Sequence, residues 1–175
     1  MKKSNWVLFV TNGLIAILFG VLVLFVDQAT IISLVRIFGV VLLVAGLVLF
    51  YYAYRSMKVK NSYLLLMIQA IVAVLIGLIV AINPGQSLNL FLTLVGIWAA
   101  IMGLLQIIVA IRLRKKVTNH LLFTLNGIIT LMVGLLLFYS PMATLGTLLM
   151  IVGVLALVAG VVMVYLGVKV RGVKE

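Results

Sequence analysis

The sequence predicts an all-α integral membrane protein: a six-transmembrane-helix bundle made of three parallel two-helix repeats of equal length, in a pseudo-threefold arrangement. Three observations predict it, namely six apolar runs of spanning length, a recurrence of glycine and polar residues at one constant offset, and cations confined to alternate connections. Of 175 residues, 67% are hydrophobic and 9% are charged, whereas soluble domains carry about 25% charged residues. Lipid must therefore surround most side chains.

Each apolar run is long enough to cross a bilayer as a helix. At about 1.5 Å per residue, the runs reach roughly 29 to 36 Å, against a hydrocarbon core of about 30 Å. Membrane-spanning β-strands alternate apolar and polar residues, which these runs do not. The runs cover residues 6–26, 31–52, 63–82, 88–111, 121–139 and 145–168.

The run at 6–26 follows a basic start, as a signal peptide would. It is longer than the usual apolar region of about 7 to 15 residues, and its residues recur at the same offset in later segments. We therefore expect it to be retained as a transmembrane helix.

The constant offset is the separation between Gly20 and Gly77, and it holds without a gap over the whole chain. It predicts a single integral membrane domain, 1–175, with repeats 4–60, 61–117 and 118–174. Glycines of one helix recur seven residues apart, which places them on one helix face and permits close backbone approach. The predicted helix-packing residues are Gly13, Gly20, Gly39, Gly46, Gly77, Gly96, Gly103, Gly127, Gly134, Gly153 and Gly160.

A hydroxyl residue precedes the second apolar run of each repeat. This position favours a helix N-cap, because the side-chain oxygen accepts from unpaired backbone N–H groups. Three residues earlier stand one aspartate and two prolines, and proline cannot continue the preceding helix. We therefore expect turns of about four residues. The predicted turn and cap residues are Thr30, Pro84, Ser87, Pro141 and Thr144, with Asp27 in place of the first proline.

Twelve of the thirteen Lys and Arg residues fall in the termini and the connections between repeats. Loops rich in Lys and Arg stay on the cytoplasmic side. The sequence therefore predicts a multi-pass protein of the cytoplasmic membrane with both termini in the cytoplasm. The net charge of +11 is split among short segments, which favours anionic lipid headgroups as partners and not nucleic acid. The twelve are Lys2, Lys3, Arg55, Lys58, Lys60, Arg112, Arg114, Lys115, Lys116, Lys169, Arg171 and Lys174.

Four polar residues within the apolar runs are candidate functional residues. Arg36 lies about six residues into the second run; it either contacts a ligand or ion, or it reaches the outer headgroups or pairs with Asp27. The amides Asn12, Gln69 and Asn126 share one repeat column. They either form interhelical hydrogen bonds or line a small polar pathway.

The pattern of a glycine, a proline seven residues later and two further glycines seven apart resembles the HdeD-like acid-resistance membrane proteins. The resemblance implies short repeats of paired membrane helices and a role in surviving acid stress. It implies no catalytic motif. The pattern occurs in two copies, as Gly77, Pro84, Gly96 and Gly103 and as Gly134, Pro141, Gly153 and Gly160.

An enzyme, a metal site and a cofactor are not expected. Cysteine is absent, and Asp27 and Glu175 are the only carboxylates, so no pair exists for acid–base chemistry. The lone His120 shares a repeat column with Trp6 and Tyr63, which is typical of a membrane-interface residue. Three function classes remain: a structural or protective membrane protein, a transporter or channel, and a lipid-binding or partner-binding module. A homo-oligomer or a membrane-protein partner also stays open.

Overall fold

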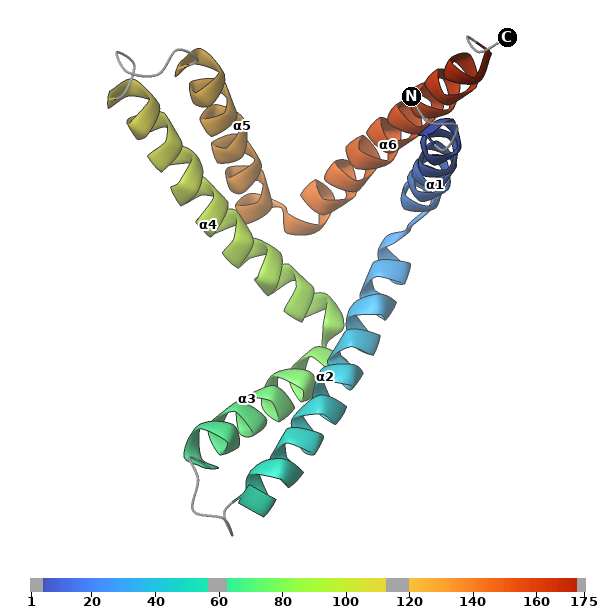
Figure 1. The fold of residues 1–175 in the computed structure, drawn as a ribbon. Helices are drawn as coiled ribbons and strands as arrows, with labels where there is room; N and C mark the ends of the chain where they lie inside the picture. The colour runs from blue at the N-terminus through green and yellow to red at the C-terminus, as the bar shows by residue number, and fades with distance from the viewer. Residues whose placement is uncertain (1–4, 57–62, 113–119, 173–175) are drawn as a thin grey trace. The chain divides into compact units, whose positions relative to one another are not determined.

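A computed structural model describes residues 5–56, 63–112 and 120–172 of the chain, and these residues are almost entirely α-helical (Figure 1). Six helices within these ranges are long and apolar enough to cross a membrane, so the predicted all-α fold with six spanning helices is confirmed. The helices are α1 (Asn5–Leu24), α2 (Gln28–Ser56), α3 (Tyr63–Ile82), α4 (Pro84–Arg112), α5 (His120–Tyr139) and α6 (Pro141–Gly172).

The turns within the second and third repeats are shorter than predicted. Only Asn83 separates α3 from α4, and only Ser140 separates α5 from α6. The backbone N–H of Asn83 donates to the carbonyl of Ile79 at 2.9 Å, while its own carbonyl accepts from the N–H of Ser87 at 3.0 Å. One residue thus ends one helix and begins the next.

The predicted N-caps Ser87 and Thr144 are therefore wrong, because each is the fourth residue of its helix. The prolines take the first helical position, where their missing N–H would have no intrahelical partner and their fixed φ already suits a helix. Asn83 and Ser140 hold the position before them, which favours short polar residues.

The turn of the first repeat is longer, with residues 25–27 between α1 and α2, and its second helix begins one repeat position later. It has Asp27 where the other copies have proline, and α2 begins at Gln28. Aspartate is among the favoured residues directly before a helix, so Asp27 takes the place that Asn83 and Ser140 hold elsewhere. Thr30 is accordingly the third residue of α2, and its prediction as N-cap is also wrong.

The chain divides into two compact units. One comprises residues 28–142 and contains α2 to α5, and the other comprises 1–27 and 143–175 and contains α1 with nearly all of α6. Within the first unit, α2 packs along α3 and α4 along α5, while α4 meets α2 and α3 much less extensively. Within the second unit, α1 packs along α6.

Each helix therefore finds its main packing partner across the boundary of the predicted repeats. In the second repeat, α3 lies chiefly against α2 of the first repeat and not against α4, which directly follows it. The two helices of one sequence repeat, such as α3 and α4, are thus not the two helices that pack closely together, such as α2 and α3.

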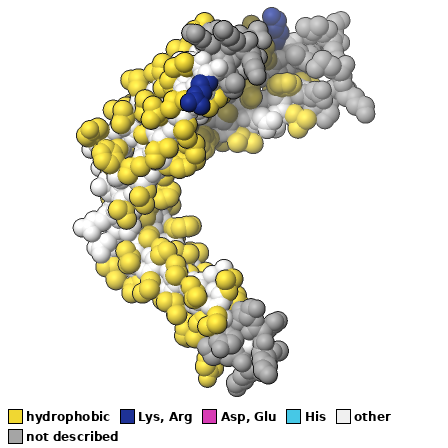
Figure 2. Space-filling view, turned by 90° about the vertical axis from the view of Figure 1, so that its left-hand side faces the viewer, with side chains coloured by type: hydrophobic (Ala, Val, Ile, Leu, Met, Phe, Trp, Pro, Cys, Tyr) yellow, Lys and Arg dark blue, Asp and Glu magenta, His cyan; other side chains and the backbone are white. Residues whose placement is uncertain are grey.

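Small residues form the interior of each pair. No large side chain is completely buried among the described residues, and the buried apolar side chains are Ala53, Ala70, Leu92, Ala110 and Leu137. Bulky side chains point outwards instead, and Figure 2 shows one face of the protein covered largely by hydrophobic side chains. Such a surface suits lipid, since the hydrocarbon core is as apolar as leucine.

Candidate functional site

Glycine residues form the interface between α4 and α5. We call each such closely packed interface between two helices a seam. A Cβ atom added at Gly96 would lie 2.8 Å from both the carbonyl oxygen of Gly134 and the backbone nitrogen of Phe138. One added at Gly103 would collide with the backbone nitrogen of Leu131. Because these obstacles are backbone atoms, a larger side chain requires the helices to move apart. The seam therefore depends on glycine at these positions.

The pair of α2 and α3 repeats this arrangement. An added Cβ at Gly39 would lie 2.6 Å from the backbone nitrogen of Ala81, and one at Gly46 would lie 2.7 Å from that of Val74. These contacts pair increasing residue numbers on α2 with decreasing numbers on α3. The two helices are therefore antiparallel.

The pair of α1 and α6 repeats it again, although these helices lie at opposite ends of the sequence. A Cβ added at Gly13 would lie 2.8 Å from the carbonyl oxygen of Gly160, and one at Gly20 would lie 2.8 Å from that of Gly153. Close backbone approach of this kind brings Cα–H groups near carbonyl oxygens, a weak attraction worth roughly 0.5 to 1 kcal/mol per contact.

The three seams share one register. Gly46 meets Val74, Gly103 meets Leu131, and Gly160 meets Ile17. The three glycines hold the same position in successive repeats, and so do the three residues that they meet. One packing arrangement is thus built three times.

All eleven glycines predicted to pack are buried. Three buried small residues were missed, namely Ala53, Ala110 and Gly167. They extend the seams of α2, α4 and α6 by one heptad, and a Cβ added at Gly167 would lie 2.7 Å from Cγ2 of Val10. Their spacing of seven residues after Gly46, Gly103 and Gly160 could have revealed them.

Two amides meet across the seam of α4 and α5. The side-chain Nδ2 of Asn126 donates to Oε1 of Gln106 at 3.1 Å. Gln106 was not predicted as a partner, because its repeat counterparts are the apolar residues Leu49 and Met163. The separation of the two residues in the sequence does not predict this contact. The signal that could have predicted it is a second amide within the apolar run of the neighbouring helix.

The other two amides of the column lack this arrangement. Asn12 and Gln69 are exposed, and the residues opposite them at the Gln106 position are Met163 and Leu49. All three amides are therefore exposed, and what distinguishes Asn126 is the second amide, Gln106, that faces it.

Arg36 is exposed on α2 and lies further from the start of its helix than the sequence predicted. Because α2 begins at Gln28, Arg36 is its ninth residue, and its Cα lies about 12 Å along the axis from the helix start. A guanidinium at this depth must reach toward the headgroups or meet a polar partner, because a charge in hydrocarbon is costly.

Cations lie near the ends of the long helices, and α6 contains two of them, Lys169 and Arg171. Arg55 and Arg112 lie in the last turns of α2 and α4, and Lys169 is exposed near the end of α6. A cation there also interacts favourably with the helix dipole. The predicted cytoplasmic cations outside the described residues are Lys2, Lys3, Lys58, Lys60, Arg114, Lys115, Lys116 and Lys174.

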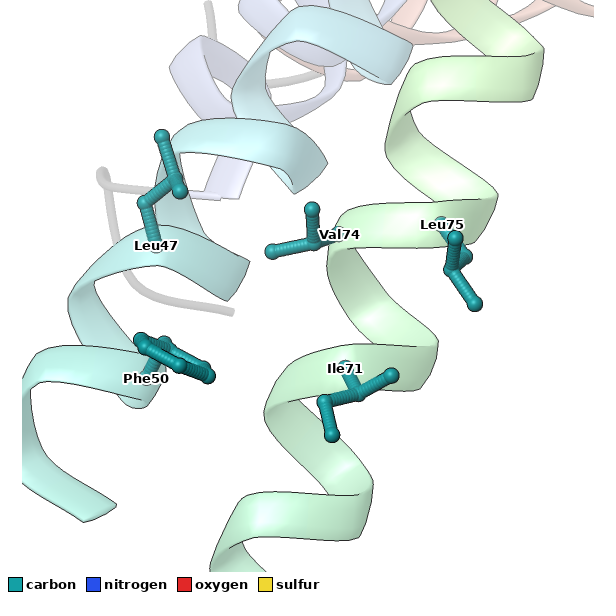
Figure 3. A pocket seen from close by; sticks show the side chains of 5 residues that line it. All are labelled: Leu47, Phe50, Ile71, Val74 and Leu75. Atoms are coloured by element: carbon teal, nitrogen blue, oxygen red, sulfur yellow. The ribbon is translucent and has the colours of Figure 1, made fainter. Parts of the chain in front are cut away.

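An open apolar groove of about 270 Å³ runs along the surface of the α2 and α3 pair. Leu47 and Phe50 line it from α2, and Val74 points from α3 towards α2 (Figure 3). The remaining lining residues are Ile71 and Leu75, also on α3. Nearly all of the lining surface is apolar, so the groove suits a hydrocarbon chain better than a polar solute.

A metal centre finds no support in the described part of the chain, where no three His, Asp or Glu side chains group together. His120 is the first residue of α5, and α3 likewise begins at Tyr63. Their interface role stays a prediction.

The repeats of the sequence match a known family. No curated protein and no solved structure matches the chain. The family described as a short repeat of unknown function (DUF308) matches three times, at residues 11–68, 68–139 and 125–175, which together cover most of the chain. HdeD-like proteins belong to the same family. With six helices of spanning length and three matching repeats, the chain is a membrane protein that belongs to the DUF308 short-repeat family.

Proposed function

We propose that the protein is a non-enzymatic structural component of the cytoplasmic membrane that helps the cell to withstand acid stress. The observation that carries the proposal is the single glycine register repeated in all three helix pairs. A chain whose small residues form three closely packed helix pairs is suited to a structural role in the bilayer. The stress role is implied by the resemblance to HdeD-like proteins.

The proposal includes a pseudo-threefold bundle with both termini in the cytoplasm. Two spans per repeat give successive copies the same orientation in the membrane, so an axis along the membrane normal relates them. Equal registers in the three pairs support such an axis. The concentration of Lys and Arg in the connections between repeats supports the orientation.

The bundle can be tested with engineered cysteines, since the natural chain has none. Cysteine replaces Asn12, Gln69 and Asn126 in pairs, and oxidative cross-linking is measured in membranes. A threefold bundle with these positions facing the axis gives all three cross-links. Cross-linking of one pair alone would contradict the threefold arrangement.

The acid role is tested by deleting the gene and measuring survival and membrane leakage at low pH. Wild-type protein should restore survival, Gly160→Leu should not, and Gly146→Leu should restore it, because a Cβ at Gly146 meets nothing within 4 Å. Unchanged acid survival in the deletion strain would refute the stress role.

Transport of a small solute or ion is the second candidate, and Arg36 is the observation that favours it. A cation on the ninth residue of α2 is expensive in lipid, and its repeat counterparts Thr93 and Met150 show that the fold does not require it. Flux through the purified, reconstituted protein that Arg36→Leu abolishes would favour transport. Equal leakage from vesicles with and without protein would exclude it.

A further inference from the structure

We propose that Arg36 binds the phosphate of an anionic phospholipid in the leaflet opposite to Arg55, which is the outer leaflet in the proposed orientation. The inference names a lipid site that is separate from the cation-rich cytoplasmic connections. It rests on the proposed function only in requiring a membrane-inserted protein, and its test is independent of acid survival.

The length of α2 places Arg36 near a membrane boundary. The helix has 29 residues, about 43 Å, which matches a bilayer with both headgroup layers, about 40 to 45 Å. Arg55 lies in its last turn, and exposed tyrosines precede it, as is typical of the headgroup level. Arg36 lies nineteen residues before Arg55, about 28 Å along the axis. The two cations are therefore separated by about one hydrocarbon core.

The polar residues of the three long helices mark the same boundary. In α2, α4 and α6, charged, amide and hydroxyl side chains occur in the first three turns, and the stretches that follow contain none. Arg36 is the last such residue before its apolar stretch, as its repeat counterpart Thr93 is in α4. Headgroups accommodate polar side chains and hydrocarbon does not, so the boundary lies near Arg36. The apolar stretches are 37–50, 94–105 and 148–164.

Apolar residues also lie between Arg36 and the start of α2, but protein covers most of them. Ile31, Ile32 and Val35 are half-buried, whereas Leu34 is exposed. The start of α4 contributes to this cover, because a Cβ added at Gly85 would lie 3.9 Å from Cδ1 of Ile32. These residues therefore do not require the hydrocarbon core to extend past Arg36.

The side chain of Arg36 is open to a ligand from the membrane. The seam of α2 reaches Gly39, which meets Ala81, and α3 ends at Ile82. Arg36 lies about one turn beyond this covered part of α2 and is exposed. It makes no hydrogen bond or ion pair with any residue in the described part of the chain.

Asp27 is the nearest carboxylate in the sequence, but it is poorly placed to neutralise Arg36. It directly precedes α2, and Arg36 lies nine residues later, about 13 Å along the axis and half a turn around it. The charge is therefore met from outside the chain. A phosphate is suited to this role, because it accepts two parallel hydrogen bonds from a guanidinium and lies at the boundary of the hydrocarbon core.

The helix α4 provides a matched control. Arg112 matches Arg55, whereas Thr93 stands in the position of Arg36. Both helices thus end in a cation, but only α2 has one at the opposite boundary. A general attraction of basic helix ends for anionic lipid would act equally on both helices, whereas the proposed site acts on α2 alone.

The test uses tryptophan quenching by brominated lipids. Trp6 and Trp98, the two natural tryptophans, are replaced by phenylalanine in the full-length protein. Val40→Trp supplies a probe about one turn from Arg36, and Ile97→Trp supplies the matched probe in α4; both positions are exposed. The protein is reconstituted in vesicles that contain brominated phosphatidylglycerol or brominated phosphatidylcholine, and helicity confirms that each variant folds.

Phosphatidylglycerol should quench the Val40→Trp probe at about fivefold lower lipid fraction than phosphatidylcholine, the preference expected of one cation beside one anionic headgroup. Arg36→Thr should remove this preference, and Arg55→Gln should leave it unchanged. The Ile97→Trp probe should show little preference until Thr93→Arg introduces the cation there.

Equal quenching by the two lipids at the Val40→Trp probe would overturn the proposal, and so would a preference that persists in Arg36→Thr. The same preference at the Ile97→Trp probe without Thr93→Arg would also overturn it. A further arm replaces chloride by inorganic phosphate at equal ionic strength, which should leave the preference unchanged. Its loss in phosphate alone would show that Arg36 binds a free anion and not a lipid.

Discussion

The pair of α4 and α5 and the pair of α1 and α6 reach the same seam by different routes. In the first, residues 113–119 join the helices directly, and the hydrogen bond from Asn126 to Gln106 crosses the seam. In the second, four helices separate the partners in sequence, and Met163 stands where Gln106 would be. Both nevertheless share one register. The comparison shows that the register requires neither a short connection nor an amide bond, and we expect both of these to add stability to the pair of α4 and α5.

The largest effect is expected from Gly160→Leu in the α1 and α6 pair. Its side chain would enter space within 2.7 Å of the carbonyl oxygen of Gly13, and no short connection holds the two helices together. We expect a loss of about 3 kcal/mol and a fall in melting temperature of roughly 6 to 12 °C in detergent. Gly146→Leu in the same helix is the control and should melt close to the wild type. Equal melting temperatures for both variants would remove Gly160 from the seam.

A smaller loss is expected from Gly96→Leu in the α4 and α5 pair. The clash is similar, since an added Cβ lies 2.8 Å from backbone atoms of α5. The connection 113–119 keeps the helices at high effective concentration, so the pair can reform after local separation. Thermal unfolding measures the difference, with Gly85→Leu as control because only the tip of Ile32 lies near it, at 3.9 Å. A greater loss than for Gly160→Leu would contradict the role of the connection.

Asn126→Leu tests the amide bond itself. Interhelical hydrogen bonds in membrane proteins contribute about 0.6 to 1.7 kcal/mol, so the free energy of unfolding should fall by that amount. Gln69→Leu is the control, because Leu49 stands opposite in place of an amide. Equal destabilisation by the two substitutions would show that the bond with Gln106 is not the cause.

The smallest expected effect is an increase in the free energy of unfolding. Leu49→Gln places an amide opposite Gln69, as Gln106 stands opposite Asn126, and should raise the free energy of unfolding by about 0.6 kcal/mol. The double variant Leu49→Gln with Gln69→Leu should lose this gain. A gain that persists in the double variant would show that the new glutamine acts through other contacts.

Hydrophobic length, glycine spacing and repeat offset were enough to predict the six helices and eleven of the glycines that are buried. Lipid leaves few alternatives, because every backbone polar group in the bilayer must be satisfied within a helix. Gly46 and Gly103 could be predicted as packing residues, because small residues on one face of a membrane helix are typical of helix–helix interfaces.

The first residues of the second helix in each repeat were predicted less accurately. Thr30, Ser87 and Thr144 carry the side chains of N-caps, yet the helices begin earlier, at Gln28, Pro84 and Pro141. Hydroxyl residues are also tolerated inside membrane helices, where they bond to the preceding turn, as Thr93 does to the carbonyl of Asn89 at 2.8 Å. Proline at the first helical position was the stronger signal.

By itself, the sequence determined the membrane environment, the six spans and the glycine faces of the helices, because these follow from local composition and spacing. Only the tertiary structure decided that α3 packs on α2, α5 on α4 and α1 on α6. A glycine face permits close approach of another helix, but it does not predict which helix that is, because the preceding and the following helix could both pack against it. Only the structure shows which glycine faces meet, and it joins residues such as Gly13 and Gly160 that are far apart in the chain.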